Sequence, residues 1–353
     1  MTPEELLVIT KNFVEELEHA KNALPSSLSF IKNTIPSIPL ITDAALFEVM
    51  VIGGTVFQKA LCKKDNGAIV IVKVEEKSRP LFPTKNDFLS FVKNRLDKNC
   101  HFLAINFAHA MQPVFEKNKV DGIFLFPSKE NLYEGLVGEK VGEEIEKYCK
   151  NSLSVSVAND TICLLLAGKD TTPWEASAGG IVGTGVNFAF FDKENEIINL
   201  EAGRFNKFVQ TETGKIIDKN SVCPNEYLFE KEVSGAYLFE HFNLFCQQKN
   251  ISYSPLKNSE ELNNLAADTN NPRGEIARNI ITHSAQLVAC EIAGITFYKK
   301  QNMTFLMEGS IFWKGYQYKK IIEETVRKLC PEFSITFENK KNADIIGAAK
   351  LLS

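Results

Sequence analysis

The chain has 353 residues, 44% of them hydrophobic and 24% charged. This length and composition suit two folded domains and exclude a disordered chain. A formal net charge of -4 at pH 7 leaves no electrostatic footprint for nucleic acid or an anionic membrane surface. The eight cysteines form no C-x-x-C pair, so we expect reduced thiols in a cytoplasmic protein. The acidic, amphipathic N-terminal segment is unlike a signal peptide, and no apolar run approaches the ~20 residues that span a bilayer.

The first predicted elements are a helix, a linker and three strands. Apolar residues recur on one stripe between residues 3 and 23, which predicts a helix. The prolines that follow predict a linker without regular structure. Three strand-like runs come next, FEVMVIGG, TVFQKALCKK and AIVIVKVEE, joined at Gly53-Gly54 and then at Asp65-Asn66-Gly67, a strong hairpin signal.

The same scheme returns later in the chain. GGIVGTG, VNFAFFDK and EIINLEAG again indicate strand, glycine turn, strand, polar turn and strand, and aligning Gly54 with Gly185 places the copies about 130 residues apart. Solenoids repeat at roughly 20–50 residues, so this spacing predicts a duplicated domain. We therefore expect two α/β lobes that face each other across a cleft, where ligands tend to bind.

Other segments complete the predicted order. HFLAINFA and SVSVA are strand-like, and SVSVA runs directly into the helical segment NDTICLLLAG. Long helices are predicted over residues 227–248 and 275–300, and the strand MTFLMEGS follows them. Two shorter helices, over residues 317–329 and 343–352, come last.

Three glycine turns each follow an apolar strand: Gly53-Gly54-Thr55, Gly183-Thr184-Gly185 and Gly309-Ser310. Glycine lets backbone N–H groups approach a phosphate closely, and a neighbouring Thr or Ser adds a hydroxyl donor. None fits the Walker pattern or the dinucleotide G-x-G-x-x-G. Taken singly each is more often a plain hairpin turn, but three turns at matching strand ends favour phosphate binding.

Three carboxylates are candidates for chemistry on a hydroxylated substrate. Asp160, within Asn159-Asp160-Thr161, lies where a strand meets a helix, so it either caps that helix or takes a proton from an attacking hydroxyl. Glu201 ends a strand and Glu230 lies near the start of a helix. Paired carboxylates accept hydrogen bonds from vicinal sugar hydroxyls, although a lone surface glutamate is commoner.

Together these segments resemble the hexokinase family, in the family's order. The resemblance rests on VIGGTVFQKAL, SVSVANDTICLLLAG, IVGTGVNFAFF, INLEAGRF, LFEKEVSGAYLFE, RNIITHSAQLVACEIAGI and GAAKLL, and it runs from about residue 46 to the C-terminus. It implies an actin-like (ribonuclease H-like) fold whose lobes close over sugar and nucleotide. The implied boundaries are 41–157 with 338–353 for the small lobe, 158–337 for the large lobe, and 1–40 packed on the large lobe.

The resemblance also implies roles for single residues. Asp160 would be the base for the 6-hydroxyl of a hexose, and the other hydroxyls would be held by Asn159, Asn187, Glu201 and Glu230. Lys129, in FPSKENL, falls on a sugar-contacting Thr-Lys pair of the family, with Ser128 in place of the threonine. ATP and Mg²⁺ are the implied cofactors, with no protein ligand assigned to the metal. The residues expected to line the nucleotide are Gly53, Gly54, Thr55, Gly183, Thr184, Gly185, Gly309 and Ser310.

Three positions depart from the family's pattern. The family has an aspartate two residues before the first glycine of the first turn, and this chain has Val51 there. Nearby Glu48 should point to the opposite face of the strand. The family's arginine after the turn falls on Gln58, and the serine of its Phe-Ser-Phe-Pro sugar loop is lost at residues 107–110. His109 in that loop is expected to be packed or solvated.

The residues favour an ATP- and Mg²⁺-dependent hexokinase with glucose as acceptor. Retention of the sugar-binding residues fits equally well an alternative, a hexokinase-like sugar sensor or regulator with little turnover. Repressor-type sugar kinases usually carry a Cys/His zinc cluster, and this sequence has none with ligand spacing. Actin-like filament proteins and chaperone ATPases lack the contexts of Glu201 and Glu230. We expect hexose and ATP as partners, no nucleic acid or membrane, and a monomer or homodimer.

Overall fold

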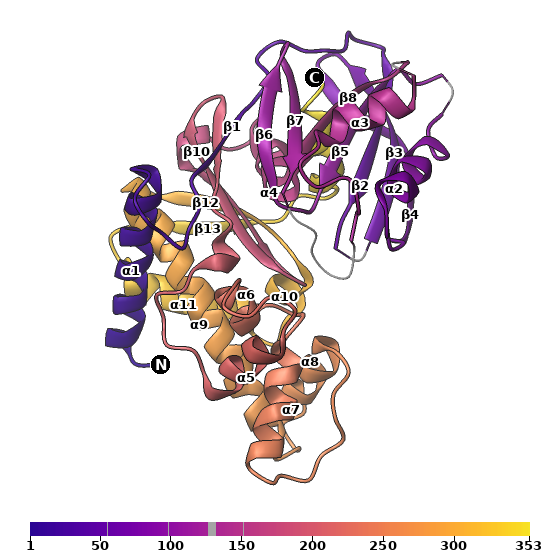
Figure 1. Cartoon of the computed structure of the whole chain (residues 1–353). Helices are drawn as coiled ribbons and strands as arrows, with labels where there is room; N and C mark the ends of the chain where they lie inside the picture. Colours follow the sequence, from indigo (N-terminus) through magenta and orange to yellow (C-terminus); the bar gives the residue numbers. More distant parts are fainter. Residues whose placement is uncertain (55, 98, 126–131, 151) are drawn as a thin grey trace. The chain divides into compact units, whose positions relative to one another are not determined.

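The computed structural model describes residues 1–353 apart from 55, 98, 126–131 and 151 (Figure 1). It divides into two compact units. Unit 1 comprises Met1–Phe30, Gly180–Phe188 and Leu200–Asn339, and unit 2 comprises Ile31–Gly179, Ala189–Asn199 and Lys340–Ser353. The lobe boundaries expected from the sequence stay a prediction.

The five-stranded sheet belongs to unit 2 and has the order β4-β3-β2-β5-β8. The first three strands in the sequence pair antiparallel, and β5 and β8 continue the sheet in parallel. Asn66 and Gly67 both have positive φ, 49° and 80°, as the predicted hairpin turn requires. The strands are β2 (Leu46–Ile52), β3 (Val56–Asp65), β4 (Ala68–Ser78), β5 (Phe102–Phe107) and β8 (Ser154–Asn159).

The six-stranded sheet has the order β1-β11-β10-β9-β12-β13. Without β1 it repeats the other sheet: the first strand in the sequence is central, the next two lie on one side and the last two on the other. This repetition confirms the predicted duplication. The strands are β1 (Ile31–Thr34), β9 (Ser177–Val182), β10 (Val186–Lys193), β11 (Glu196–Asn199), β12 (Met303–Glu308) and β13 (Ile335–Glu338).

Two expectations about regular structure were wrong. The proline-rich linker contains β1, which pairs antiparallel with β11, because the prolines lie beyond the four residues of the strand. The helix expected over residues 227–248 is two helices, α6 (Leu228–Val233) and α7 (Leu238–Gln248). It breaks because Gly235 N–H donates to the Gly183 carbonyl at 2.7 Å, a bond that a continuous helix would not allow.

In unit 1, α1 (Pro3–Lys21) lies beside α9 (Gly274–Lys299) and α11 (Tyr318–Leu329) (Figure 1). The ring of Phe13 occupies the space that a side chain at Gly294 of α9 would need. By length and composition α9 could cross a bilayer, but 72% of its most apolar window is buried within the protein, as in a core helix. The other helices of this unit are α5 (Glu212–Asn220), α8 (Ser259–Ala267) and α10 (Ser310–Lys314).

The sheet of unit 2 is covered on both faces. On one face α4 (Asp160–Gly168) and α12 (Ala343–Ala349) pack over a cluster that includes Val49, Val51 and Ala60. On the other face α2 (Lys85–Lys93) and α3 (Val141–Tyr148) pack over Met50 and its neighbours. The hairpin of β6 (Met111–Glu116) and β7 (Lys119–Phe124) forms a separate two-stranded sheet.

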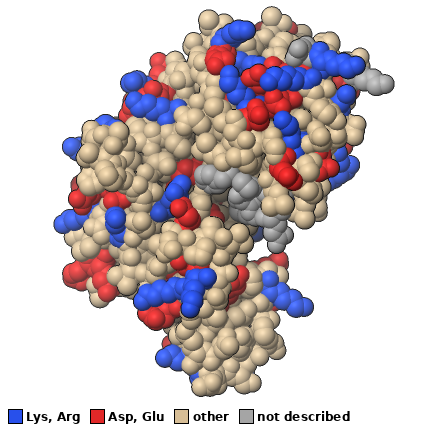
Figure 2. Space-filling model, viewed as in Figure 1, with Lys and Arg blue, Asp and Glu red and all other residues tan. Residues whose placement is uncertain are grey.

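Charged side chains of both signs are interspersed on the face of the molecule that Figure 2 shows. All eight cysteines are free thiols, six of them buried. Burial raises the pKa of the Cys62 and Cys290 thiols to about 12, which makes both poor nucleophiles at neutral pH.

Candidate active site

The glycine turns of unit 1 meet each other. A side chain at Gly183 would come within 3.2 Å of the Gly309 Cα, so the turn after β9 and the turn after β12 are in backbone contact. Gly309 has φ 109°, and a Cβ there would overlap the Val182 carbonyl. Ser310 follows as the first residue of α10. The two turns therefore bring their backbones together at glycines, where main-chain N–H groups can approach a phosphate closely.

The turn between β9 and β10 is held by main-chain bonds. The Gly183 carbonyl accepts from Gly235 N, and the Thr184 carbonyl accepts from Ala236 N at 3.3 Å. The Gly183 N–H donates to the Gly185 carbonyl at 2.9 Å. Segments far apart in the sequence thus fix the shape of the turn through backbone atoms alone.

Asn187, Glu201 and Glu230, the residues expected to bind sugar, all belong to unit 1. The Glu230 Oε2 accepts from Val186 N at 3.1 Å, and the Asn187 Oδ1 accepts from Ala202 N at 3.1 Å. Glu201 adopts a left-handed conformation with φ 47°. Such a conformation is strained for a non-glycine residue and is often found at binding sites.

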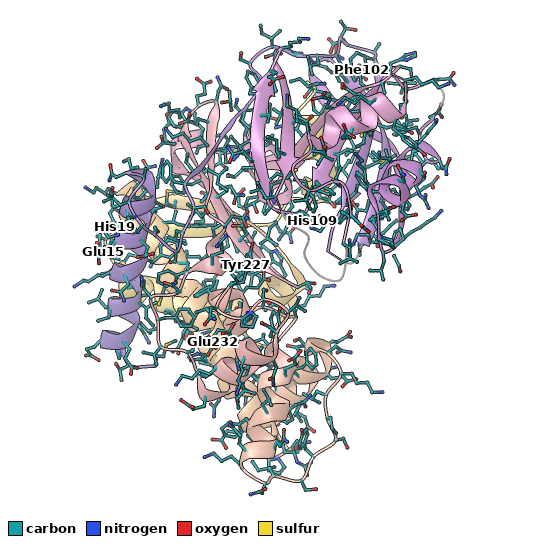
Figure 3. The ribbon with its side chains drawn as sticks, viewed as in Figure 1. Glu15, His19, Phe102, His109, Tyr227 and Glu232 are labelled. Atoms are coloured by element: carbon teal, nitrogen blue, oxygen red, sulfur yellow. The ribbon has the colours of Figure 1, made fainter. Side chains whose placement is uncertain are left out.

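Tyr227, one helical turn before Glu230, borders the same carboxylates (Figure 3). Burial, and then the charge of Glu201, raise the pKa of Tyr227 above its usual range, and Glu230 acts in the same direction. The Arg204 guanidinium lies 5.5 Å from the centre of the tyrosine ring. Tyr227 and Arg204 also line a polar pocket of about 360 Å³, together with Ser26, Ser27 and Ser29.

Buried charges fix helix α6, which carries Glu230. Lys231 pairs with Asp218 at 2.6 Å, and the Asp218 carboxylate accepts from Asn225 N at 3.0 Å. Glu232, on the same helix, contacts His283 at 3.3 Å. Burial tends to raise the pKa of Glu232, but His283 and other polar partners outweigh it, so the pKa lies below its usual range. These contacts hold α6, and with it Glu230, in one position.

In unit 2, Asp160 is the first residue of α4, and Asn159 is the residue that caps the helix. The Thr161 N–H donates to Asn159 Oδ1 at 3.0 Å and to Asp160 Oδ1 at 2.8 Å. The Asn159 Nδ2 donates to the His109 carbonyl at 3.3 Å. Because Asn159 supplies the cap, Asp160 is oriented by the start of the helix without being the cap itself.

His109 is packed rather than solvated, with 5% of its surface exposed (Figure 3). Its ring lies 4.7 Å from that of Phe107, and its Nε2 is 3.2 Å from the Tyr133 hydroxyl. Burial raises the pKa of Tyr133 to about 12. The loop that has lost the family's serine is therefore held by aromatic packing beside Asn159.

The first glycine turn is held by a side chain that the sequence analysis missed. The Arg79 guanidinium donates to the Gly54 carbonyl from Nη2 at 2.8 Å and from Nε at 3.1 Å. The hairpin could have revealed this contact. Pairing outward from Asn66-Gly67, with a register shift of one residue at Leu61/Cys62, brings Ser78 opposite Val56. Residue 79 therefore lies beside the turn.

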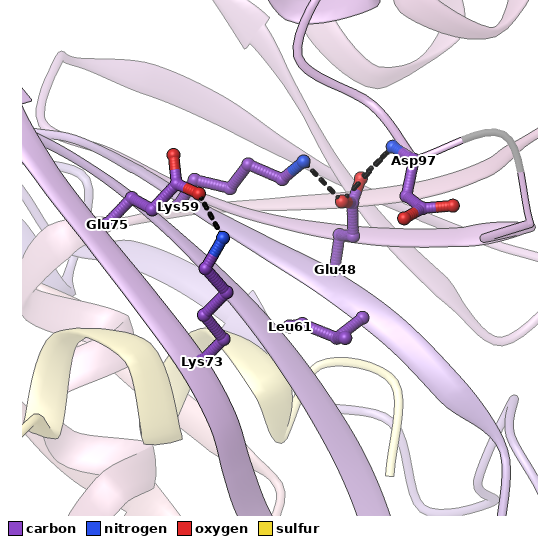
Figure 4. Close-up of a pocket in the computed structure, with 6 residues that line it drawn as sticks. All are labelled: Glu48, Lys59, Leu61, Lys73, Glu75 and Asp97. Carbon is purple, nitrogen blue, oxygen red and sulfur yellow. Dashed lines mark hydrogen bonds and ion pairs between the residues drawn. The ribbon is translucent and has the colours of Figure 1, made fainter.

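Val51 and Glu48 point to opposite faces of β2. Val51 packs in the cluster beneath α12, whereas Glu48 is buried on the other face and pairs with Lys59 at 2.6 Å (Figure 4). The Glu48 carboxylate also accepts from Asp97 N, at 3.1 Å. Glu48 therefore cannot replace the aspartate that the family has at position 51.

The candidate residues thus fall into two sets that the structure assembles separately. Unit 1 holds Asn187, Glu201 and Glu230 with the turns at 183–185 and 309–310, and unit 2 holds Asn159 and Asp160 with Gly53 and Gly54. Thr55, Ser128 and Lys129 lie outside the described residues.

The two sheets share one strand order, and glycine turns follow their strands. This arrangement is the actin-like ATPase fold of the α/β class.

Solved structures of that fold match the chain. A hexokinase from Schistosoma mansoni complexed with glucose aligns with a TM-score of 0.80 at 19% identity, covering 100% of this chain and 95% of that one. A ROK family glucokinase from Streptomyces griseus in complex with glucose and AMPPNP aligns with a TM-score of 0.59 at 16% identity, over 87% of this chain and 99% of that one.

The hexokinase family model matches residues 177–264 and 256–352. Hexokinase-2 of Rattus norvegicus is 23% identical over 99% of this chain and 46% of its own length. Hexokinase-1 of Nicotiana tabacum is 23% identical over 92% of this chain and 82% of its own length. The chain belongs to the hexokinase family, and it spans about half the length of the rat relative.

Proposed function

We propose that the chain transfers the γ-phosphoryl group of ATP to the 6-hydroxyl of a hexose, with glucose as the expected acceptor. One observation carries the proposal: backbone N–H groups hold Glu230 and Asn187 in fixed positions beside Glu201. Fixed carboxylate and amide oxygens of this kind can read the pattern of hydroxyls around a sugar ring.

In the proposed reaction the 6-hydroxyl oxygen attacks the γ-phosphorus while the bond to the ADP oxygen breaks. Asp160 accepts the hydroxyl proton, a role that typically contributes ~10²–10⁴-fold to the rate. Its carboxylate suits this role because the Thr161 N–H holds one oxygen at 2.8 Å and the start of α4 favours negative charge. The glycine turns bind phosphate oxygens through the backbone, so most of the remaining rate enhancement comes from positioning.

Mg²⁺, bound to the ATP phosphates, would supply charge neutralisation. Among the residues that the structure describes, no group of three or more His, Cys, Asp or Glu side chains could hold a metal ion. Two buried amide oxygens near the first glycine turn, Gln58 Oε1 and Asn106 Oδ1, have no hydrogen-bond partner within that part of the chain. Amide oxygens of this kind can accept hydrogen bonds from water molecules bound to a metal that arrives with the nucleotide.

The test is a coupled assay of ADP release with ATP, Mg²⁺ and a panel of hexoses, together with calorimetry of sugar binding. Asp160→Ala should lower kcat by ~10²–10⁴-fold and leave sugar affinity nearly unchanged. Glu230→Gln should weaken sugar binding about tenfold, since it replaces a hydrogen bond to a charged acceptor, worth ~1.5–3 kcal/mol, by one to a neutral acceptor, worth ~0.5–1.5 kcal/mol.

Glu212→Gln is the matched control, because Glu212 is an exposed glutamate of the same unit that pairs with Lys215. Sugar binding without turnover across the panel would instead identify a sugar sensor. Absence of sugar binding would overturn the proposal altogether.

A further inference from the structure

Four side chains form a row across the sheet of unit 2, close to the first glycine turn. The register pairs Val51 with Gln58 and with Asn106, and it pairs Gln58 with Glu76. Residues opposite each other on neighbouring strands point to the same face. The row therefore runs Glu76–Gln58–Val51–Asn106, and its member on β2, Val51, lies two residues before Gly53.

Two of the departures from the family's pattern lie side by side in this row. Val51 replaces the family's aspartate, and its strand partner Gln58 replaces the family's arginine. Val51 is 8% exposed and packs in an apolar cluster. Gln58 Nε2 donates to Glu76 Oε2 at 2.9 Å. The two positions at which this chain lacks the family's charged residues are thus strand partners, and a carboxylate is present one strand further out.

Helix α12 brings a second acidic residue, Asp344, to the same face. This helix packs on β2 and β5, and Asn106 Nδ2 donates to the carbonyl of Asp344 at 3.4 Å. Asp344 lies in the first turn of α12, with its Oδ1 accepting from Ile345 N at 2.8 Å. Burial, and to a smaller degree the charge of Glu76, raise the pKa of Asp344. The two carboxylates therefore share one electrostatic environment on this face.

The row also presents oxygen atoms that lack partners. Asn106 is 2% exposed, and its Oδ1 and the Oε1 of Gln58 are buried without a hydrogen-bond partner among the described residues. Leaving a buried acceptor unpaired costs ~1–3 kcal/mol, so such groups usually mark a water or ion. Two amide oxygens with two carboxylates match the all-oxygen surroundings of hydrated Mg²⁺.

We propose that Asp344, together with Glu76, has taken over the role of the carboxylate that the family has at position 51. In this chain the row holds the water shell of the Mg²⁺ that arrives with the nucleotide, and Asn106 holds the main chain of Asp344 at the start of α12. The inference rests on the proposed function for the nucleotide, but it concerns metal binding and can be tested without turnover.

The test uses Mn²⁺ as the probe, with its binding measured by water-proton relaxation in the presence of ADP and glucose. Removing a partner of a metal's water shell typically weakens metal binding by 10–100-fold. We therefore expect Asp344→Asn to weaken Mn²⁺ binding roughly tenfold and Glu76→Gln to weaken it less. Glu75→Gln is the matched control, since Glu75 lies on the opposite face and pairs with Lys73 at 2.6 Å (Figure 4). It should leave Mn²⁺ affinity unchanged.

Restoring the family's aspartate sharpens the test. If Asp344 now serves in place of the aspartate at position 51, Val51→Asp should not raise the Mn²⁺ affinity of the wild-type chain. The same change should recover Mn²⁺ binding in the Asp344→Asn variant. A gain from Val51→Asp alone, with Asp344→Asn behaving like the control, would overturn the inference. If Asp344→Asn fails to fold, the Mn²⁺ affinity of Glu76→Gln tests the inference instead, because Glu76 is exposed and its substitution should not disturb the fold.

The two proposals fail in different ways. Suppose that the wild-type chain phosphorylates hexose, and that Asp344→Asn changes neither the Mn²⁺ affinity nor the Mg²⁺ concentration needed for half-maximal rate. This result overturns only the metal-binding inference. A chain that binds Mn²⁺ through Asp344 but never turns over any hexose overturns only the proposed function. A chain that binds no Mn²⁺ with ADP overturns the inference whatever its kinetics.

Discussion

The two glycine turns occupy equivalent places in the two sheets, but they are held by different parts of the chain. The turn at 183–185 is held by main-chain bonds and by contact with Gly309. The turn at 53–54 is held by the side chain of Arg79. A backbone contact depends on the space that glycine leaves, whereas a side chain can be supplied from a neighbouring strand. Supporting residues can therefore change position around the first turn but not around the second.

The largest effect should follow a change at Gly309, the residue that packs against the turn at 183–185. Gly309→Ala places a Cβ on the Val182 carbonyl at a residue with φ 109°. We expect destabilisation of at least ~2–4 kcal/mol from steric overlap and backbone strain, together with loss of nucleotide binding. Thermal unfolding followed with and without ATP measures both effects.

Gly67→Ala is the control for this change. Gly67 also has positive φ, 80°, but nothing lies within 4 Å of the place where its Cβ would be. It should cost only the strain, about 1 kcal/mol. Equal losses of stability in the two variants would show that Gly309 is not packed against the turn at 183–185 as tightly as the structure indicates.

A smaller effect is expected at the first turn. Arg79→Lys keeps the charge but cannot make the two-pronged contact with the Gly54 carbonyl. We expect the KM for ATP to rise by about three- to tenfold, equivalent to ~1 kcal/mol, with sugar affinity unchanged. If charge can move between strands, adding Gln58→Arg should restore part of the loss. An unchanged KM in Arg79→Lys would mean that the turn holds its shape without this side chain.

The smallest effect concerns pH. Because the pKa of Asp344 is raised on folding, the folded chain keeps the proton of this carboxyl at a pH where the unfolded chain has lost it. The free energy of unfolding therefore falls as pH rises above 3.8, the ordinary pKa of an aspartate. Asp344→Asn removes that dependence. We expect a slightly higher Tm than wild type at pH 7, with the difference vanishing towards pH 4, even though metal binding is weakened. A lower Tm at pH 7 would indicate that the carboxylate stabilises the fold.

Local patterns in the sequence predicted most of the fold. Apolar periodicity located α1, α9 and α11 within about two residues, and Asn66-Gly67 located the β3–β4 hairpin. The break between α6 and α7 was missed because its cause, the bond from Gly235 to Gly183, joins segments far apart in the sequence. Strand β1 was missed because a strand of four residues carries little pattern of its own.

The candidate site was predictable to a different degree. Strand and helix ends together with the resemblance supplied Asp160, Glu201 and Glu230, and in the structure backbone N–H groups hold the carboxylates of Asp160 and Glu230. Arg79 and Asp344 could not be found in this way, because a motif reports on the residues within it. Their contacts follow from strand register and from the packing of α12, which bring them to the first turn from other parts of the sequence.

The packing of α12 also bears on how the protein is made. Gly347 lies directly against the Cys163 carbonyl of α4, so the helix closes a surface whose other parts are complete by residue 199. At ~5–20 residues per second, the ribosome needs roughly seven to thirty seconds to reach residues 340–353 from there. Throughout that interval the part of the apolar face around Val49 and Ala60 that α12 covers stays open on the nascent chain, and a chaperone that binds apolar surfaces would have access to it.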